Sequence, residues 1–300
     1  KIMDTMRPIY EKAVADAKAA DTPEKRRGVG IAWGGFNVTE GGGDSAEVAL
    51  ELMPGNKIRK YDTWHAMGQG ATTGSLVVTL EALKEMHLTP EDIQLIQNDT
   101  KTCPDTGMAG ASRSLYMDGN ATIIAANKLL AAMRKEDGTL RTYDEMKAEG
   151  IETKYLGRYE TNTTPGLCRL DPNTGIGDPT PAFTYCLNLA EVEGDTKTGK
   201  TTVLKFTCVD FVGRIGNIDA VNGQAYSGIM HGIGFALKED YADVKKHANM
   251  FGAGTSYIKD VPDDINLIHI DGAISDGPFG SSGASEAFQA SGHCAVLNGI

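Results

Sequence analysis

Residues 182–212, AFTYCLNLAEVEGDTKTGKTTVLKFTCVDFV, carry the clearest sign of the fold. The stretches 182–194 and 200–212 are rich in β-branched and aromatic residues, and a Thr-Gly turn lies between them. This pattern predicts two strands joined as a hairpin. A helix is predicted at 219–238 and an apolar strand at 265–271. Two strands followed by a helix and another strand indicate one α+β unit.

The first half of the chain has a similar order of elements. An amphipathic helix at 4–20 precedes it, and residues 151–181, rich in Pro, Gly and Thr, are predicted to be a connecting loop. Its strands are predicted at 28–35, 45–52, 57–64 and 92–97, and its helices at 71–86, after the loop 98–110, and near 142–150.

The loose repetition of this order predicts an α+β fold, made of duplicated two-layer α/β units with mixed sheets. Three domains are expected. They are an N-terminal helix and linker at 1–27, a first cofactor-binding half at 28–181, and a second half at 182–300 that carries the catalytic glutamate loop.

Composition limits the class of protein. The chain has 300 residues, of which 41% are hydrophobic and 23% charged, which is typical of a soluble globular protein. A net charge of -11 argues against nucleic acid or an anionic membrane surface as the main partner. No run of about 20 apolar residues occurs, so no membrane span is expected.

Cysteine usage and the chain ends give weaker indications. None of the cysteines forms a CxxC pair, which argues against a zinc or iron–sulfur site in this chain, and reduced thiols are expected. Because Lys1 is not an initiator methionine and the last helix stops at Ile300, we expect a piece of a longer polypeptide. A cytoplasmic location is expected, or a periplasmic one if a signal precedes Lys1.

The run GSSGASEA, residues 280–287, places the carboxylate of Glu286 among glycines and serine hydroxyls. Gly280 and Gly283 let the backbone approach a ligand closely. One acid among hydrogen-bond donors is the arrangement that a general base needs. The alternative is an ordinary helix start with a capping serine and an early glutamate.

There are three further glycine-rich runs, of which two open a predicted helix and the third lies in the helix predicted at 219–238. Residues 68–70 (GQG) present backbone amides but match neither a P-loop nor a Rossmann fingerprint. Residues 107–113 (GMAGASR) suit a phosphate, or else close helix packing with Arg113 in solvent. Residues 223–234 (GQAYSGIMHGIG) have small residues four apart, and His231 is either a core histidine or a ligand. Together the runs indicate a large cofactor wrapped by several loops.

In order and spacing, these runs resemble the molybdenum hydroxylases, the xanthine dehydrogenase and aldehyde oxidoreductase family. The chain is most similar to the C-terminal part of the molybdopterin-binding large subunit of bacterial aldehyde oxidoreductases. The resemblance covers nearly the whole chain. It rests on KRRGVGIAWG at 25–34, GQG at 68–70, NDTKTCPDTGMAGASR at 98–113, the run at 223–234, and GPFGSSGASE at 277–286.

The resemblance implies roles for individual residues. Glu286 matches the base that deprotonates a hydroxyl on molybdenum, and Gln69 matches the glutamine near the apical oxo ligand. No protein metal ligand is implied, because the pterin dithiolene is expected to hold the molybdenum. Contacts with the cofactor are implied for Gly68, Gln69, Gly70, Gly110, Ala111, Ser112, Arg113, Gln224, Gly228, His231, Gly232, Ser282, Gly283, Ala284 and Ser285.

The implied cofactor is molybdopterin cytosine dinucleotide with molybdenum. The implied reaction converts an aldehyde to a carboxylic acid, by hydroxyl transfer from molybdenum and hydride transfer to its sulfido ligand. [2Fe–2S] clusters, with FAD as an option, are expected in other domains or subunits, and an iron–sulfur domain or subunit is the expected electron acceptor. A homodimer of the full enzyme is a further option, and this chain alone is expected to be inactive.

The chain departs from the family pattern at three places, and other functions stay open. The departures are Ala66-Met67 before the GQG run, His231 in place of a glutamine, and Ala287-Phe288-Gln289 after the glutamate. A purine or other N-heterocycle hydroxylase is one alternative, and a non-catalytic scaffold fragment is another. A serine hydrolase lacks its G-x-S-x-G motif in this chain.

Overall fold

A computed structural model describes residues 1–39, 43–161, 170–274 and 276–300. The chain divides into two compact units. Unit 1 is formed by Lys1–Phe36, Phe183–Gly272 and Ala284–Ile300, and unit 2 by Asn37–Ala182 and Ala273–Gly283. Each unit is built on its own four-stranded sheet.

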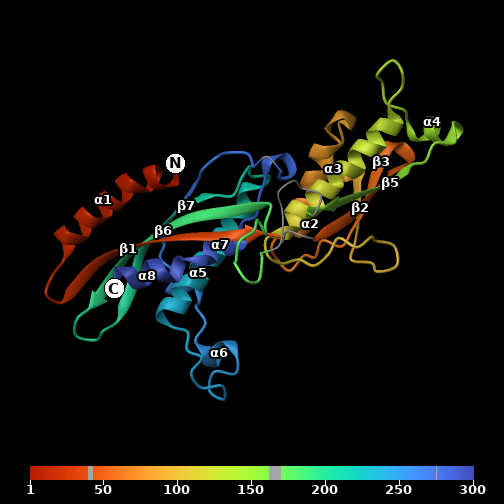
Figure 1. Cartoon of the computed structure of the whole chain (residues 1–300). Helices are drawn as coiled ribbons and strands as arrows, with labels where there is room; N and C mark the ends of the chain where they lie inside the picture. The colour runs from red at the N-terminus through yellow and green to blue at the C-terminus, as the bar shows by residue number, and fades with distance from the viewer. Residues whose placement is uncertain (40–42, 162–169, 275) are drawn as a thin grey trace. The chain divides into compact units, whose positions relative to one another are not determined.

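The sheet of unit 1 has the strand order β1-β6-β7-β8 (Figure 1). β6 (Ala182–Asp195) and β7 (Thr201–Phe211) are the antiparallel hairpin that the sequence predicts. β8 (Asp264–His269) pairs parallel to β7, and β1 (Lys25–Val38) lies at the other edge beside β6.

Helices cover both faces of this sheet, because both faces of β6 are apolar. Leu187 and Leu189 pack against α1, whereas Cys186 and Ala190 belong to the core under α5, α7 and α8. The side chains alternate because successive strand residues point to opposite faces. The helices of unit 1 are α1 (Ile2–Ala20), α5 (Ile218–Leu237), the short α6 (Met250–Ala253), α7 (Ser285–Ala290) and α8 (Gly292–Gly299).

The sheet of unit 2 has the order β4-β3-β2-β5. β2 (Ser45–Met53) pairs antiparallel with both β3 (Lys57–Asp62) and β5 (Lys154–Glu160). β4 (Ile93–Gln97) pairs parallel to β3.

Two helices, α2 (Ala71–Ala82) and α3 (Arg113–Met133), pack on the sheet of unit 2 around Leu50, Ile58 and Leu129. The shorter α4 (Tyr143–Ala148) follows and contributes Met146 to the same core. Short 3₁₀ turns in the chain lie at Pro54–Asn56, Lys84–Met86, Pro90–Asp92, Ile258–Asp260 and Pro278–Gly280.

The two units repeat one arrangement of elements. In each, an antiparallel hairpin leads into a helix and then into a strand parallel to the second hairpin strand, as β2-β3-α2-β4 and β6-β7-α5-β8. The predicted fold of duplicated α/β units with mixed sheets is therefore confirmed. Unit 1 adds a third layer, because α1 covers the face of the sheet opposite α5.

The structure differs from the sequence prediction in three places. β5 (Lys154–Glu160) lies inside the predicted loop 151–181, of which residues 162–169 are outside the described part. The expected helix up to Ile300 is broken at Ser291 into α7 and α8. The capping serine of the alternative interpretation is absent from α7, because its N-cap is Ala284 and no side chain caps it.

The compact units also cut across the predicted contiguous halves. Residues 28–36 lie in unit 1 because β1 pairs with β6, and residues 273–283 lie in unit 2. The boundaries of independently folding domains stay a prediction. In the described residues, no helix is both long and apolar enough to cross a membrane.

Candidate functional site

The predicted GQG turn connects β3 to α2 in unit 2. Gly68 and Gly70 have φ of 99° and 87°, values that glycine adopts without a Cβ penalty. The carboxamide of Gln69 folds back on the same turn. Its Oε1 accepts a hydrogen bond from the Met67 amide at 2.6 Å, and its Nε2 donates to the His65 carbonyl at 2.6 Å. Gln69 thus braces the turn, while both glycines are exposed.

Arg113, at the start of α3, is 3% exposed, so the interpretation of a solvated arginine is wrong. Its Nε and Nη2 donate to the two carboxylate oxygens of Asp44, both at 2.8 Å. Its Nη atoms also donate to the carbonyls of Thr106, Met108 and Ser45, at 3.1, 2.6 and 3.0 Å.

A guanidinium has five N–H groups, and these five bonds account for all of them. The group therefore holds the loop 107–112 in place from inside the protein. Its predicted contact with a cofactor phosphate stays a prediction, and these partners give Arg113 a supporting role for the loop.

Ala111 and Ser112 end this loop with left-handed backbone, each with φ of 50°. The Ala111 carbonyl accepts a hydrogen bond from the Thr39 amide at 3.0 Å, which fixes the loop against the end of β1. Gly283 lies directly against it, because a Cβ at Gly283 would be 2.4 Å from the Ser112 Cβ. Unit 2 thus brings together two sequence-predicted runs, 110–113 and 282–283.

Ser282 adds a polar atom beside Gly283. Its side chain is 2% exposed, and its Oγ has no hydrogen-bond partner in the described residues. A buried hydroxyl without a partner is costly, so Ser282 Oγ is available to bond a group that the described residues do not supply. An acceptor-rich ligand such as a pterin or a phosphate fits this position.

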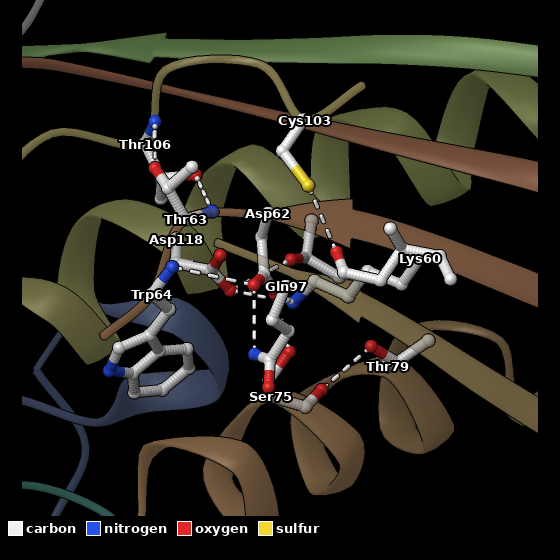
Figure 2. Close-up of polar contacts among 12 residues, drawn as sticks. Lys60, Asp62, Thr63, Trp64, Ser75, Thr79, Gln97, Cys103, Thr106 and Asp118 are labelled. Atoms are coloured by element: carbon white, nitrogen blue, oxygen red, sulfur yellow. Dashed lines mark hydrogen bonds and ion pairs between the residues drawn. The ribbon is translucent and has the colours of Figure 1, made fainter. Parts of the chain in front are cut away.

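Unit 2 also contains a buried charge cluster of Lys60, Asp62 and Asp118 (Figure 2). The Lys60 Nζ lies 2.7 Å from Asp118 Oδ1 and 3.3 Å from Asp62 Oδ2, and all three side chains are fully buried. Ser75 of α2 donates to Asp62 at 2.6 Å, and Gln97 of β4 donates to it at 2.8 Å. Sequence reasoning missed this cluster, because Lys60 and Asp118 are 58 residues apart.

Burial raises the pKa of Asp118 to about 6, although Lys60 opposes the shift; the charge of Asp62 adds to it. One ammonium faces two carboxylates, so protonation of Asp118 makes the cluster neutral. The oxygen Asp118 Oδ2 has no partner in the described residues.

Two threonines connect the charge cluster to both loops. The amide of Thr63, the residue after Asp62, donates to Thr106 Oγ1 at 2.9 Å, and the Thr106 amide donates to Thr63 Oγ1 at 2.9 Å. Thr106 is in turn bonded to Arg113 through its carbonyl. Hydrogen bonds thus join the strand that enters the GQG turn to the loop 107–112, and Figure 2 shows the Thr63–Thr106 pair of these bonds.

In unit 1, the other predicted residues gather where α5 meets α7 and α8. Ser285 Oγ donates to Gln224 Oε1 at 2.7 Å. A Cβ at Gly228 would lie 2.7 Å from the Phe288 Cβ, and one at Gly232 would lie 2.9 Å from the Gly292 Cα. Both glycines thus permit close helix packing. His231 is exposed, so the interpretation as a core histidine is wrong.

Glu286 is half-buried in α7. The residues on either side of Glu286 are held in place by contacts with the rest of unit 1. Ser285 is bonded to Gln224, and the side chains of Ala287 and Phe288 are buried. Glu286 and Ala284 belong to unit 1, whereas Gln69 belongs to unit 2.

A polar group that sequence reasoning missed lies at the strand ends of unit 1. His269 Nδ1 is 2.8 Å from Asp210 Oδ2, and His269 Nε2 is 2.8 Å from Asn222 Oδ1. Burial raises the pKa of Asp210, and the nearby His269 opposes the shift. Asp210 and His269 are paired across β7 and β8, a register that only the folded sheet reveals.

Metal ligation by the protein is not indicated. The described residues contain no group of three or more His, Cys, Asp or Glu side chains that could hold a metal ion. The four described cysteines are free thiols, and Cys168 lies outside the described residues.

Comparison with known proteins connects these features to a family. A family model described as a molybdopterin cofactor-binding domain matches residues 6–262. The aldehyde oxidoreductase of Megalodesulfovibrio gigas is 38% identical over 299 residues, which is 100% of this chain and 33% of that protein. A probable hypoxanthine oxidase, XdhD, of Escherichia coli is 28% identical over 74% of this chain and 25% of its own length.

The solved aldehyde oxidoreductase of Desulfovibrio desulfuricans has the same fold. It matches with a TM-score of 0.94 and 41% identity, over 99% of this chain and 32% of the solved chain. The present chain therefore spans about a third of the length of these aldehyde oxidoreductases.

Proposed function

The chain belongs to the molybdopterin cofactor-binding domain family, within the molybdenum hydroxylases, and on this premise we propose that it forms the catalytic region of an aldehyde oxidoreductase. The observation that carries the proposal is the similarity to aldehyde oxidoreductases over the full length of the chain. The proposed reaction is oxidation of an aldehyde to a carboxylic acid.

The cofactor is proposed to be molybdopterin cytosine dinucleotide. When bound, molybdenum would supply the two-electron redox chemistry. In unit 2, the GQG turn, the left-handed residues Ala111 and Ser112, and the Ser282 hydroxyl, which has no partner among the described residues, would bind the pterin and its phosphates. Gly110 would let the ligand approach the backbone, and Gly283, packed on Ser112, would keep residues 282–283 against the loop 107–112. Gln69 would keep the turn in shape through its two local hydrogen bonds.

In unit 1, Gln224, Gly228, His231, Gly232, Ala284 and Ser285 are proposed to contact the dinucleotide. Gln224 is already bonded to Ser285, so these two residues would act as a pair. His231 is exposed on α5 and so is available to a ligand. Arg113 is proposed to act by holding the loop 107–112, because its N–H groups bond protein oxygens.

Glu286 is proposed to be the general base. Its carboxylate would accept a proton from the oxygen that attacks the aldehyde carbonyl, and the buried neighbours Ala287 and Phe288 would keep the helix in place during the reaction. The oxidation of the aldehyde also needs an electron acceptor, which we propose is an iron–sulfur domain or subunit outside this chain. A homodimer of the full enzyme and a cytoplasmic location are part of the same proposal.

Substitution of Glu286 tests the assignment. In the complete enzyme, Glu286→Gln is expected to lower kcat by about 10²–10⁴-fold with unchanged molybdenum content, because only the proton acceptor is removed. Glu239→Gln, at another half-buried glutamate of unit 1, is the control and should keep normal turnover. Near-normal turnover of Glu286→Gln would rule out this residue as the base.

Simple assays distinguish two other functions from the proposed oxidation of aldehydes. A purine or another N-heterocycle is the alternative substrate class, and the 28% identity to a probable hypoxanthine oxidase supports it more weakly. Turnover of hypoxanthine but not of aldehydes would favour it. Absence of molybdenum and nucleotide from the mature complex would favour a non-catalytic scaffold.

A further inference from the structure

The position of Glu286 depends on a very short helix. α7 has six residues, and helices of this length have no stability of their own in water. Its place must therefore be set by contacts with the rest of unit 1. Two of these are the Ser285–Gln224 hydrogen bond and the packing of Phe288 on Gly228.

A third contact comes from the sheet below. The thiol of Cys186, on β6, donates to the carbonyl of Ala287 at 2.8 Å. Carbonyls at the end of a helix lack partners further along it, and Ala287 lies in the last turn of α7. The Cys186 thiol thus satisfies a helix-end carbonyl one residue after Glu286.

Cys186 belongs to a small polar group in an otherwise apolar core. Asn188 Nδ2 donates to Ser291 Oγ at 3.0 Å and lies 3.7 Å from Cys186 Sγ. Ser291, where α7 ends, donates to the Ala32 carbonyl at 3.4 Å. Cys186 and Asn188 are fully buried, and Ser291 nearly so.

Cys186 and Ser291 are closely packed against the backbone of β1 at Gly34. A Cβ at Gly34 would lie 2.6 Å from Ser291 Oγ and 2.9 Å from Cys186 Sγ. Burying polar side chains is costly unless they are bonded, and apolar residues would fill the same core at no such cost. Here the Cys186 thiol bonds α7 directly, and Asn188 bonds Ser291 where α7 ends.

We propose that Cys186, supported by Asn188 and Ser291, is a positioning residue that fixes α7 and so directs the carboxylate of Glu286. The proposal rests on the proposed role of Glu286 as the base. Cys186 acts through the backbone of α7 and touches no reacting atom.

The test compares Cys186→Ala, Cys186→Ser and Cys103→Ala in the complete enzyme. Cys103 is the matched control. Its thiol also donates to a backbone carbonyl, that of Ile96 at 3.2 Å, but both residues belong to unit 2 rather than to α7. Hydrogen exchange of the amides at 285–291, kcat, KM and molybdenum content are measured for each variant.

Cys186→Ala is expected to lose one hydrogen bond, and so to speed amide exchange at 285–291 by about 5–10-fold. The kcat should fall by a similar factor, about 5–10-fold, with KM and molybdenum content unchanged, because the base is displaced rather than removed. Cys186→Ser keeps a donor and should restore both values. Cys103→Ala should match the wild type in both. If Cys186→Ala does not fold, Ser291→Ala provides the second variant, with the same expected direction.

Equal exchange and kcat in Cys186→Ala and Cys103→Ala would overturn the proposal. Faster exchange with unchanged kcat would overturn it too, since the thiol would then be a structural contact alone. The exchange measurement needs no turnover. If Glu286→Gln kept its activity, the proposed function would fail, while exchange would still report whether Cys186 holds α7.

Discussion

At the scale of single residues, the charge balance of the buried cluster in unit 2 has a measurable consequence. Lys60 is paired with two carboxylates, so at neutral pH the cluster carries one excess negative charge inside the protein. The pKa of Asp118 is raised to about 6 by burial, against an ordinary value of 3.8. The folded protein therefore holds a proton at this site more tightly than the unfolded chain does.

The sign of the pH effect follows from this difference. Between about pH 4 and pH 6 the folded state binds more protons, so the free energy of unfolding decreases as the pH rises. The decrease due to Asp118 is about 3 kcal/mol, since one pKa unit corresponds to about 1.4 kcal/mol.

We expect the variant Asp118→Asn to lose this pH dependence. An asparagine can still accept from Lys60 and Thr122, which Asp118 Oδ1 does in the native protein, but it does not titrate. Hydrogen exchange of α3 amides between pH 4 and pH 7, corrected for intrinsic rates, measures the free energy of opening in both proteins. An unchanged slope in Asp118→Asn would mean that another group takes up the proton.

At the scale of elements, close helix contacts in unit 1 depend on the absence of side chains. Gly228 and Gly223 both lie in α5, but a Cβ at Gly228 would be 2.7 Å from Phe288, whereas a Cβ at Gly223 meets nothing within 4 Å. The two positions form a natural pair for comparison.

Gly228→Ala is expected to lower the free energy of unfolding by about 1–3 kcal/mol, because the added methyl pushes α7 away from α5. Gly223→Ala is expected to raise it by about 0.5–1 kcal/mol, because alanine favours the helix. Thermal unfolding of both variants, with kcat as a second readout, measures the difference. Equal stability of the two would show that α5 and α7 adjust without strain.

Much of the secondary structure follows from local pattern, and the exceptions have physical reasons. The sequences of β6 and β7 have alternating or continuous apolar residues, and both strands were predicted. β5 was missed because Gly157 is its only buried residue and its partner, β2, lies more than a hundred residues earlier. The break at Ser291 was missed because its bonds, to Asn188 and Ala32, come from distant strands.

The candidate site was predictable only in part. The glycine-rich runs were found because their residues are contiguous in the sequence. The structure confirms that unit 2 brings Gly283 against Ser112. The partners of Arg113 were not predictable, since Asp44 is 69 residues away. The buried Lys60 cluster and the Asp210–His269 pair were missed for the same reason, because each joins separate strands or helices. The roles of Gln69 and Glu286 stay predictions.

At the scale of the whole molecule, the two units are interleaved along the chain. Unit 1 takes three separate segments and unit 2 takes two. β1 comes early in the chain but belongs with β6, and residues 273–283 come late but belong to unit 2. A cut at the predicted boundary between 181 and 182 therefore divides both units.

We expect the fragments 1–181 and 182–300 not to fold when each is produced alone. The second fragment would lack α1 and β1, leaving β6 as an unpaired edge that favours aggregation. Circular dichroism and exchange of the separate and co-produced fragments provide the measurement. Cooperative unfolding of either fragment alone would support the contiguous domains predicted from sequence.

The left-handed pair Ala111 and Ser112 has one more consequence, for the speed and strength of ligand capture. Neither residue is glycine, so each costs about 1–3 kcal/mol in this conformation. That cost is met when the protein folds, with Arg113 and Thr39 holding the loop. A ligand arriving at this loop then meets a preorganised surface, and its binding free energy is not reduced by an ordering entropy at that moment.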